Sequence, residues 1–143
     1  MKIICHKNNG EGLIKSPVIM ISASSDEHVD DLISSTPQEL EPCVLNAEDL
    51  PSDRVFFMAW ELSNGKVTID LTKAKSIGHD IRRAMREIEF SPLDNAIAKQ
   101  IPNSGVTDAD RQVIRDKYAT IQTQIDAATT PEEIKAALNT EGA

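Results

Sequence analysis

Apolar and polar residues alternate in the first half of the chain, at a spacing that is typical of β-strands. We expect three short strands before residue 50, at residues 1–7, 18–22 and 43–47. In the first strand, Ile3 and Cys5 are expected to form the buried face, with Ile4 on the opposite, polar face. A short helix over residues 26–34 is predicted between the second and third strands, because Ser24 or Ser25 can cap its first turn.

The strongest short-range signal is Asn64-Gly65, which lies between two apolar runs and predicts a tight β-hairpin. The strands of this hairpin are expected at residues 56–62 and 66–71. The alternation assigns Phe57, Ala59 and Glu61 to one face, and Phe56, Met58, Trp60 and Leu62 to the other. Because three of the five aromatic residues lie between Phe56 and Trp60, the best-specified core is expected here.

After residue 71 the apolar spacing changes to three and four residues, which indicates helices that are apolar on one side. The first helix is expected to begin at Thr72, which caps it, and to end at a break at Ser91-Pro92. Its apolar stripe comprises Ala74, Ile77, Ile81, Met85 and Ile88. A second short helix is predicted from Pro92 to about Ile101.

Two further helices are predicted, each after a threonine that can cap it. One spans residues 107–127, and the other opens at Thr130-Pro131. One-sided helices joined by short turns favour an antiparallel helical hairpin. The sequence therefore predicts an α+β protein with a small β-rich domain at residues 1–71, which contains one short helix, and a helical hairpin with a short C-terminal helix at residues 72–143.

The formal net charge of −8 is unevenly distributed along the chain. Residues 1–70 hold 5 Lys/Arg against 12 Asp/Glu, whereas residues 71–143 hold 10 against 11. An acidic front half would repel nucleic-acid phosphates, so no nucleic-acid partner is expected. No run approaches the roughly 20 apolar residues that a membrane-spanning helix needs, so no membrane partner is expected either.

Although the whole chain is acidic, residues 73–86 are locally basic. Lys75, His79, Arg82 and Arg86 recur at helical spacing and would share one helix face. Such a face can be solvated, can read nucleic acid, or can dock onto protein. The lack of interleaved aromatic residues weighs against nucleic acid, so we assign these four residues to partner binding, with a solvated face as the alternative.

The sequence offers little material for an enzyme site. Cys5-His6 is the one adjacent Cys/His pair, and only Cys43, His28 and His79 could complete a ligand set or a nucleophilic site with it. We expect both thiols to be free and structural. The acidic cluster at residues 26–31 lacks the glycine of a calcium loop, and no phosphate-binding glycine loop occurs. No catalytic residue, metal or cofactor is therefore predicted, and the protein is not expected to be an enzyme.

The order of motifs from residue 45 to residue 138 resembles a family of small bacteriophage and prophage proteins encoded near tail and tail-fibre genes. The first motifs that carry the resemblance are Asp49-Leu50-Pro51-Ser52-Asp53-Arg54, Phe57, Ala59-Trp60-Glu61, Gly65, Val67-Thr68-Ile69-Asp70 and Lys73-Ala74-Lys75. The later ones are Asp80-Ile81-Arg82-Arg83, Pro92-Leu93-Asp94, Arg111-Gln112, Arg115-Asp116 and Thr130-Pro131-Glu132-Glu133-Ile134-Lys135. No single motif is unique, and residues 1–44 match only loosely.

The resemblance implies a phage protein that works by protein–protein contact and carries no catalytic residues. We expect a structural protein of the virion tail, made in the host cytoplasm, that binds neighbouring tail or tail-fibre subunits and could self-associate. One alternative is an assembly chaperone that the finished virion does not retain. Another is an acidic inhibitor of a host nucleic-acid enzyme, which would imitate phosphate with residues 26–53.

Overall fold

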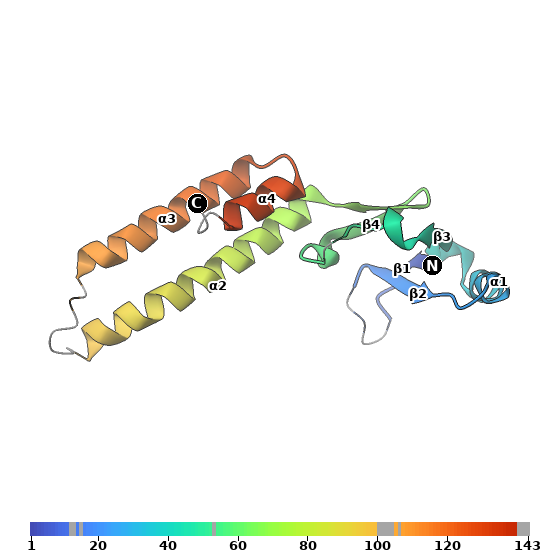
Figure 1. Cartoon of the computed structure of the whole chain (residues 1–143), viewed down its shortest axis with the longest axis horizontal. Helices are drawn as coiled ribbons and strands as arrows, with labels where there is room; N and C mark the ends of the chain where they lie inside the picture. Colours follow the sequence, from blue (N-terminus) through green and yellow to red (C-terminus); the bar gives the residue numbers. More distant parts are fainter. Residues whose placement is uncertain (12–13, 15, 53, 100–104, 106, 140–143) are drawn as a thin grey trace. The chain divides into compact units, whose positions relative to one another are not determined.

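The computed structural model describes residues 1–11, 14, 16–52, 54–99, 105 and 107–139, and it shows a mixed α+β protein (Figure 1). The strands are β1 (Lys2–Lys7), β2 (Val18–Ser22), β3 (Cys43–Asn46), β4 (Trp60–Ser63) and β5 (Lys66–Ile69). The α-helices are α1 (Asp26–Ser35), α2 (Leu71–Ala98), α3 (Asp108–Ala127) and α4 (Pro131–Leu138). The chain divides into two compact units, Met1–Ala74 and Lys75–Ala143; the sequence places the boundary between residues 71 and 72.

The first unit contains an antiparallel sheet of order β2-β1-β3, so that β1 is the central strand. The prediction that Ile4 lies on an exposed face is wrong, since Ile4 is 0% exposed. The reason is that both faces of β1 are covered. Helix α1, with its buried Val29, packs on β1, while Ile3 and Cys5 join Trp60 in the main core of this unit.

The hairpin of β4 and β5 forms around the predicted turn. Asn64 and Gly65 have φ values of 51° and 69°, the pair of left-handed conformations that a tight hairpin turn of this type requires. The first strand is shorter than predicted, because Phe57–Ala59 form a 3-10 turn and β4 begins only at Trp60. Phe56 and Ala59 are both buried and Met58 is 49% exposed, so the two-residue alternation predicted for a strand does not hold in this turn.

Helix α2 differs from the prediction at its start and in its middle. It begins at Leu71, and its cap is the Asp70 carboxylate, which accepts from the Lys73 backbone N–H at 2.9 Å, so the predicted cap at Thr72 is wrong. The predicted break at Pro92 is also wrong, since α2 is continuous to Ala98. Pro92 cannot donate to the carbonyl of Ile88, but both residues are exposed, so water can satisfy that carbonyl. The expected helix end near Ile101 lies outside the described residues.

Helices α3 and α4 confirm their predictions. Thr107 opens α3 with a reciprocal capping box to Asp110, and the Thr130 hydroxyl accepts from Glu133 at the start of α4. In the second unit α3 runs alongside α2, and its buried stripe consists of Tyr118, Ile121 and Ile125 (Figure 1).

The predicted apolar stripe of α2 is buried at its start, where Ala74 is 0% exposed, but not at its end. Gly78 lies so close to α4 that a Cβ atom there would be 2.6 Å from Cγ2 of Ile134. Ile88, at the end of the predicted stripe, is 72% exposed, so that part of the prediction is wrong. Because Gly78 has no side chain, α4 can approach α2 more closely there than at an isoleucine. The contact between the two helices therefore lies at the glycine. No helix among the described residues is long and apolar enough to cross a membrane.

Candidate docking groove on the helical unit

The four residues predicted to bind a partner lie on the side of α2 that faces α3. Lys75 Nζ donates to the backbone carbonyl of Asp126 at 2.7 Å. Nε2 of His79 lies 2.9 Å from Oδ1 of the same residue. Helix α3 has no basic residue in its last turn, so Lys75 supplies the cation that its partly negative C-terminus favours. These two side chains therefore hold α2 to α3 within the unit.

Arg82 is the most desolvated of the four. Its Nε atom is buried without a hydrogen-bond partner in the described part of the chain, and burial lowers the pKa of the guanidinium, with Arg83 and Arg86 adding to the effect. Asp126 opposes this shift, which shows that the end of α3 lies within electrostatic reach of Arg82. The guanidinium nevertheless stays charged at physiological pH because its ordinary pKa is so high.

Arg86 is exposed and is the one of the four that enters a groove between α2 and α3. Its guanidinium carbon lies 5.0 Å from the ring centroid of Phe90, a cation–π contact. No ion pair of Arg86 occurs among the residues that the structure describes. A charge that is positioned by an aromatic ring but not neutralised is available for a ligand.

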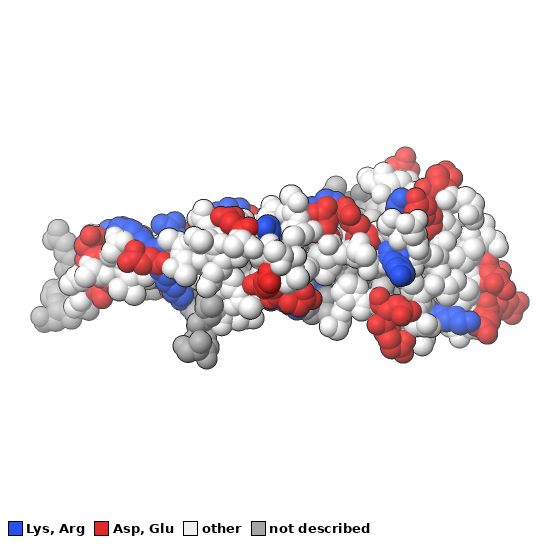
Figure 2. All heavy atoms as spheres, turned by 90° about the horizontal axis from the view of Figure 1, so that it is seen from above, with Lys and Arg blue, Asp and Glu red and all other residues white. Residues whose placement is uncertain are grey.

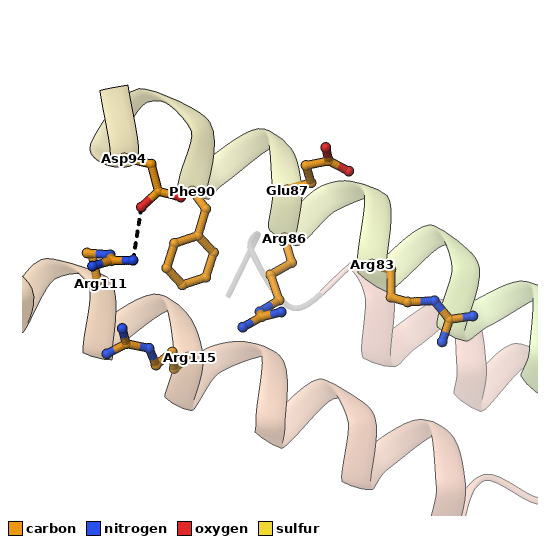
Figure 3. A pocket seen from close by; sticks show the side chains of 7 residues that line it. All are labelled: Arg83, Arg86, Glu87, Phe90, Asp94, Arg111 and Arg115. Carbon is orange, nitrogen blue, oxygen red and sulfur yellow. Dashed lines mark ion pairs between the residues drawn. The ribbon is translucent and has the colours of Figure 1, made fainter. Parts of the chain in front are cut away.

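The groove has a volume of about 490 Å³ and is dominated by arginine (Figure 3). Its lining comprises Arg83, Arg86, Glu87, Phe90 and Asp94 of α2, and Arg111 and Arg115 of α3. Figure 3 shows Arg86 and Phe90 pointing from α2 toward α3, whereas Glu87 points away from it. Arg111 and Arg115 lie one turn apart on the facing helix.

Carboxylates hold several of these guanidinium groups in place. Arg111 lies 3.1 Å from Asp94 across the groove and 3.7 Å from Asp108 on its own helix. Arg115 also lies 3.7 Å from Asp108, and Arg83 pairs with Asp80. Arg83 and Arg115 each have one carboxylate partner, which leaves several of their five N–H donors free for a second anion.

A second contact fixes the spacing of the two helices beside the groove. The Glu89 carboxylate of α2 accepts from the Tyr118 hydroxyl and from Lys117 Nζ of α3, each at 2.6 Å. Tyr118 is 1% exposed. This network is partly buried and charge-assisted, so it should keep the groove width constant when a ligand arrives.

The helical spacing of basic residues predicts a role for Arg86 in partner binding but gives none to Arg83, Arg111, Arg115 and Phe90. A signal was present in part, because Arg111 and Arg115 share a helix face at a spacing of four residues. What the sequence did not show is that this face of α3 meets the face of α2 that carries Arg86. Only the pairing of the two helices brings the guanidinium groups together.

The other candidate chemistry stays dispersed in the structure. No group of three or more His, Cys, Asp or Glu residues among those described could hold a metal ion. Cys5 and Cys43 are opposite each other in the β1–β3 ladder, and both are free thiols. Burial raises the pKa of Cys5 to about 11, the opposite of what a nucleophile needs. His28 Nδ1 accepts from the backbone of Ser24 at 3.1 Å, which is a local contact.

Comparison of the chain with family models, curated proteins and solved structures finds no match. The residues of the groove are therefore the basis on which a function can be argued.

Proposed function

We propose that the protein is a docking protein of a bacteriophage tail, which binds a neighbouring tail or tail-fibre subunit through the arginine groove of its helical unit. Two independent observations support this role. The order of motifs along residues 45–138 resembles small proteins encoded near tail genes. The groove itself presents charged donors on two helices whose spacing is fixed by the contact of Glu89 with Tyr118.

The observation that carries the proposal is the exposed Arg86 beside Phe90, with Arg111 and Arg115 across the groove. Arginine and aromatic side chains are the residues that contribute most at protein interfaces. Guanidinium groups bind carboxylates with two parallel hydrogen bonds, so the groove suits an acidic surface of a protein. Lys75 and His79 support this site by holding α2 to the end of α3, and Arg82 adds to its positive charge.

The proposal is tested by chemical cross-linking in cells that produce phage particles together with this chain. We expect the chain to be recovered with a tail or tail-fibre subunit, and its cross-links to map to residues of the groove. The double variant Arg86→Glu with Arg115→Glu should lose this partner. Lys99→Glu, an exposed charge reversal outside the groove lining, serves as the matched control and should keep the partner.

Mass spectrometry of purified particles separates a structural component from an assembly chaperone. A structural component is present in stoichiometric amounts in the finished particle, whereas a chaperone is absent although it binds a tail subunit before assembly. If the chain neither enters particles nor cross-links to a tail protein, the proposed function is wrong.

A further inference from the structure

The first unit carries a surface whose charge is opposite to that of the groove. Helix α1 presents four exposed carboxylates, Asp26, Glu27, Asp30 and Asp31, within its first two turns. Glu27, Asp30 and Asp31 have no ion pair among the described residues, whereas Asp26 pairs with Lys2 at 2.6 Å. Figure 2 shows Asp and Glu side chains gathered over the part of the molecule that Figure 1 labels as the end with α1.

The carboxylates lie opposite the buried side of α1. Val29 is 8% exposed and faces the sheet, while Glu27 and Asp31, four residues apart, fall on the opposite side of the helix and Asp30 lies on its flank. Because the fold covers only the Val29 side, the acidic side is free to approach another surface without disturbing the core.

The dimensions of helix and groove also agree. The ten residues of α1 extend over roughly 15 Å at the helical rise of 1.5 Å per residue. The part of α2 that lines the groove, from Arg83 to Asp94, extends over about 18 Å by the same rule. The four carboxylates occupy only residues 26–31, roughly 9 Å by the same rule, so the acidic face is shorter than the groove and fits within its length.

We propose that the groove of one copy binds the acidic face of α1 of a second copy, an inference that rests on the proposed docking role of the groove. The two contacting surfaces are different, so the contact is heterologous. A pair of copies then keeps one free groove and one free α1, and association continues into a ring or an open chain of subunits. Glu87, Asp94 and Asp108 reduce the net positive charge at the groove, so the contact is weak and salt-sensitive.

The test is analytical ultracentrifugation of the purified full chain over a range of concentrations. We expect the average mass to rise with concentration in low salt, and to return to that of the monomer in about 0.5 M NaCl, where the Debye length is only a few ångströms. A chain that stays monomeric at every concentration in low salt overturns the inference.

Charge reversals identify the two surfaces. Arg86→Glu with Arg115→Glu should abolish association, and Asp30→Lys with Asp31→Lys should abolish it equally. The chain with all four substitutions should regain part of the association, because the glutamates placed in the groove then face lysines at positions 30 and 31. Lys99→Glu and Glu132→Lys, which lie outside both surfaces, should leave association unchanged. Circular dichroism shows whether each variant is folded, and recovery by the fourfold variant shows that the loss in the two double variants was electrostatic.

Two outcomes assign the association to a different surface and overturn the inference. One is association that persists in the groove variant, and the other is association that survives the α1 reversal. If the chain stays monomeric but binds a tail partner that the groove variant loses, self-association is wrong and the proposed docking function stands. If the chain self-associates but binds no tail partner, the docking function is wrong and self-association stands. The two proposals can therefore fail separately.

Discussion

Trp60 is the residue on which the core of the first unit depends most. It is 0% exposed and meets Phe57 edge to face at 4.9 Å between ring centroids. The Arg54 guanidinium lies 5.3 Å from its ring centroid, so the indole is enclosed by packing and by a cation. Its Nε1 atom has no partner among the described residues, which indicates that the ring is held by contact area and not by a hydrogen bond.

We therefore predict that Trp60→Ala lowers the free energy of unfolding by about 3–5 kcal/mol, the usual cost of truncating a large buried aromatic residue. Met58→Ala is the matched control, since Met58 is 49% exposed and its truncation should cost less than about 0.5 kcal/mol. Denaturant unfolding followed by circular dichroism measures both. A thermal-melt shift of about a degree or less for Trp60→Ala would contradict the buried position of the indole.

Cys5 leads to a prediction about reactivity. Burial raises its pKa to about 11, so only about one thiol in a thousand is ionised at pH 8. We expect iodoacetamide to alkylate Cys5 far more slowly than a free cysteine peptide does, and slowly relative to the partly exposed Cys43. Peptide mass mapping over time gives both rates, and the unfolded chain, in which both thiols must react fully, is the control. Rapid labelling of Cys5 in the folded chain would show that the thiol is accessible and ionised.

At the scale of elements, Gly78 determines how closely α2 approaches α4. In an isolated helix Gly→Ala would stabilise, by about 0.5–1 kcal/mol. Here the new methyl group would meet Cγ2 of Ile134 at 2.6 Å, and Ile134 is 0% exposed. We predict that the cost of this overpacking exceeds the gain in helix propensity, so that Gly78→Ala destabilises the second unit by about 1–2 kcal/mol net.

A double-mutant cycle with Ile134→Ala tests that explanation. Removal of the isoleucine side chain makes room for the new methyl group, so Gly78→Ala should cost less in the Ile134→Ala background than in the wild type. Equal costs in the two backgrounds would mean that the clash is not the cause.

Asp70 makes the start of α2 sensitive to acid. The Lys73 backbone N–H, which donates to the carboxylate, lowers the pKa of Asp70 in the folded state. A lowered pKa adds stability that is fully present above the ordinary carboxyl pKa of about 4 and is lost as the pH falls through the lower folded value. Asp70→Asn keeps a capping oxygen but cannot titrate. We therefore expect its melting temperature to fall less steeply than that of the wild type below about pH 4, when both are followed by circular dichroism.

At the scale of the whole molecule, the charge distribution opposes nucleic-acid binding. The net charge is −8, and the arginine groove contains acidic residues as well as basic ones. We predict no retardation of DNA or RNA in a gel-shift assay at low salt, the condition that most favours electrostatic binding. Retardation that disappears in Arg86→Glu with Arg115→Glu would instead identify the groove as a polyanion site.

Much of the secondary structure could be predicted from local chemistry. The Asn64-Gly65 turn requires left-handed backbone that few other residue pairs adopt as readily, and the capping threonines of α3 and α4 act on their own first turns. The predicted break at Pro92 is wrong because proline removes only one backbone N–H donor. The local sequence does not show whether the surrounding helix is stable enough to tolerate the loss of that hydrogen bond. The hydrophobic spacing of α2 also predicted that Ile88 is buried, although it is 72% exposed. Such a spacing shows where burial would be favourable, but not whether another helix lies there to cover the residue.

The groove could not be predicted for the same reason. Its arginines come from two different helices, and no spacing rule connects Arg86 to Arg115, which lies 29 positions further along the chain.

The amino-acid sequence by itself determined the α+β class, the hairpin, the caps of α3 and α4 and the acidic character of the first half, because each depends on neighbouring residues or on a sum over them. The tertiary structure alone decided that Lys75 and His79 contact Asp126, that Ile4 is buried, and that the arginines of α2 and α3 share a groove. These depend on which helix faces meet, and that is set by contacts between residues far apart in the sequence, such as Gly78 with Ile134 and Lys75 with Asp126.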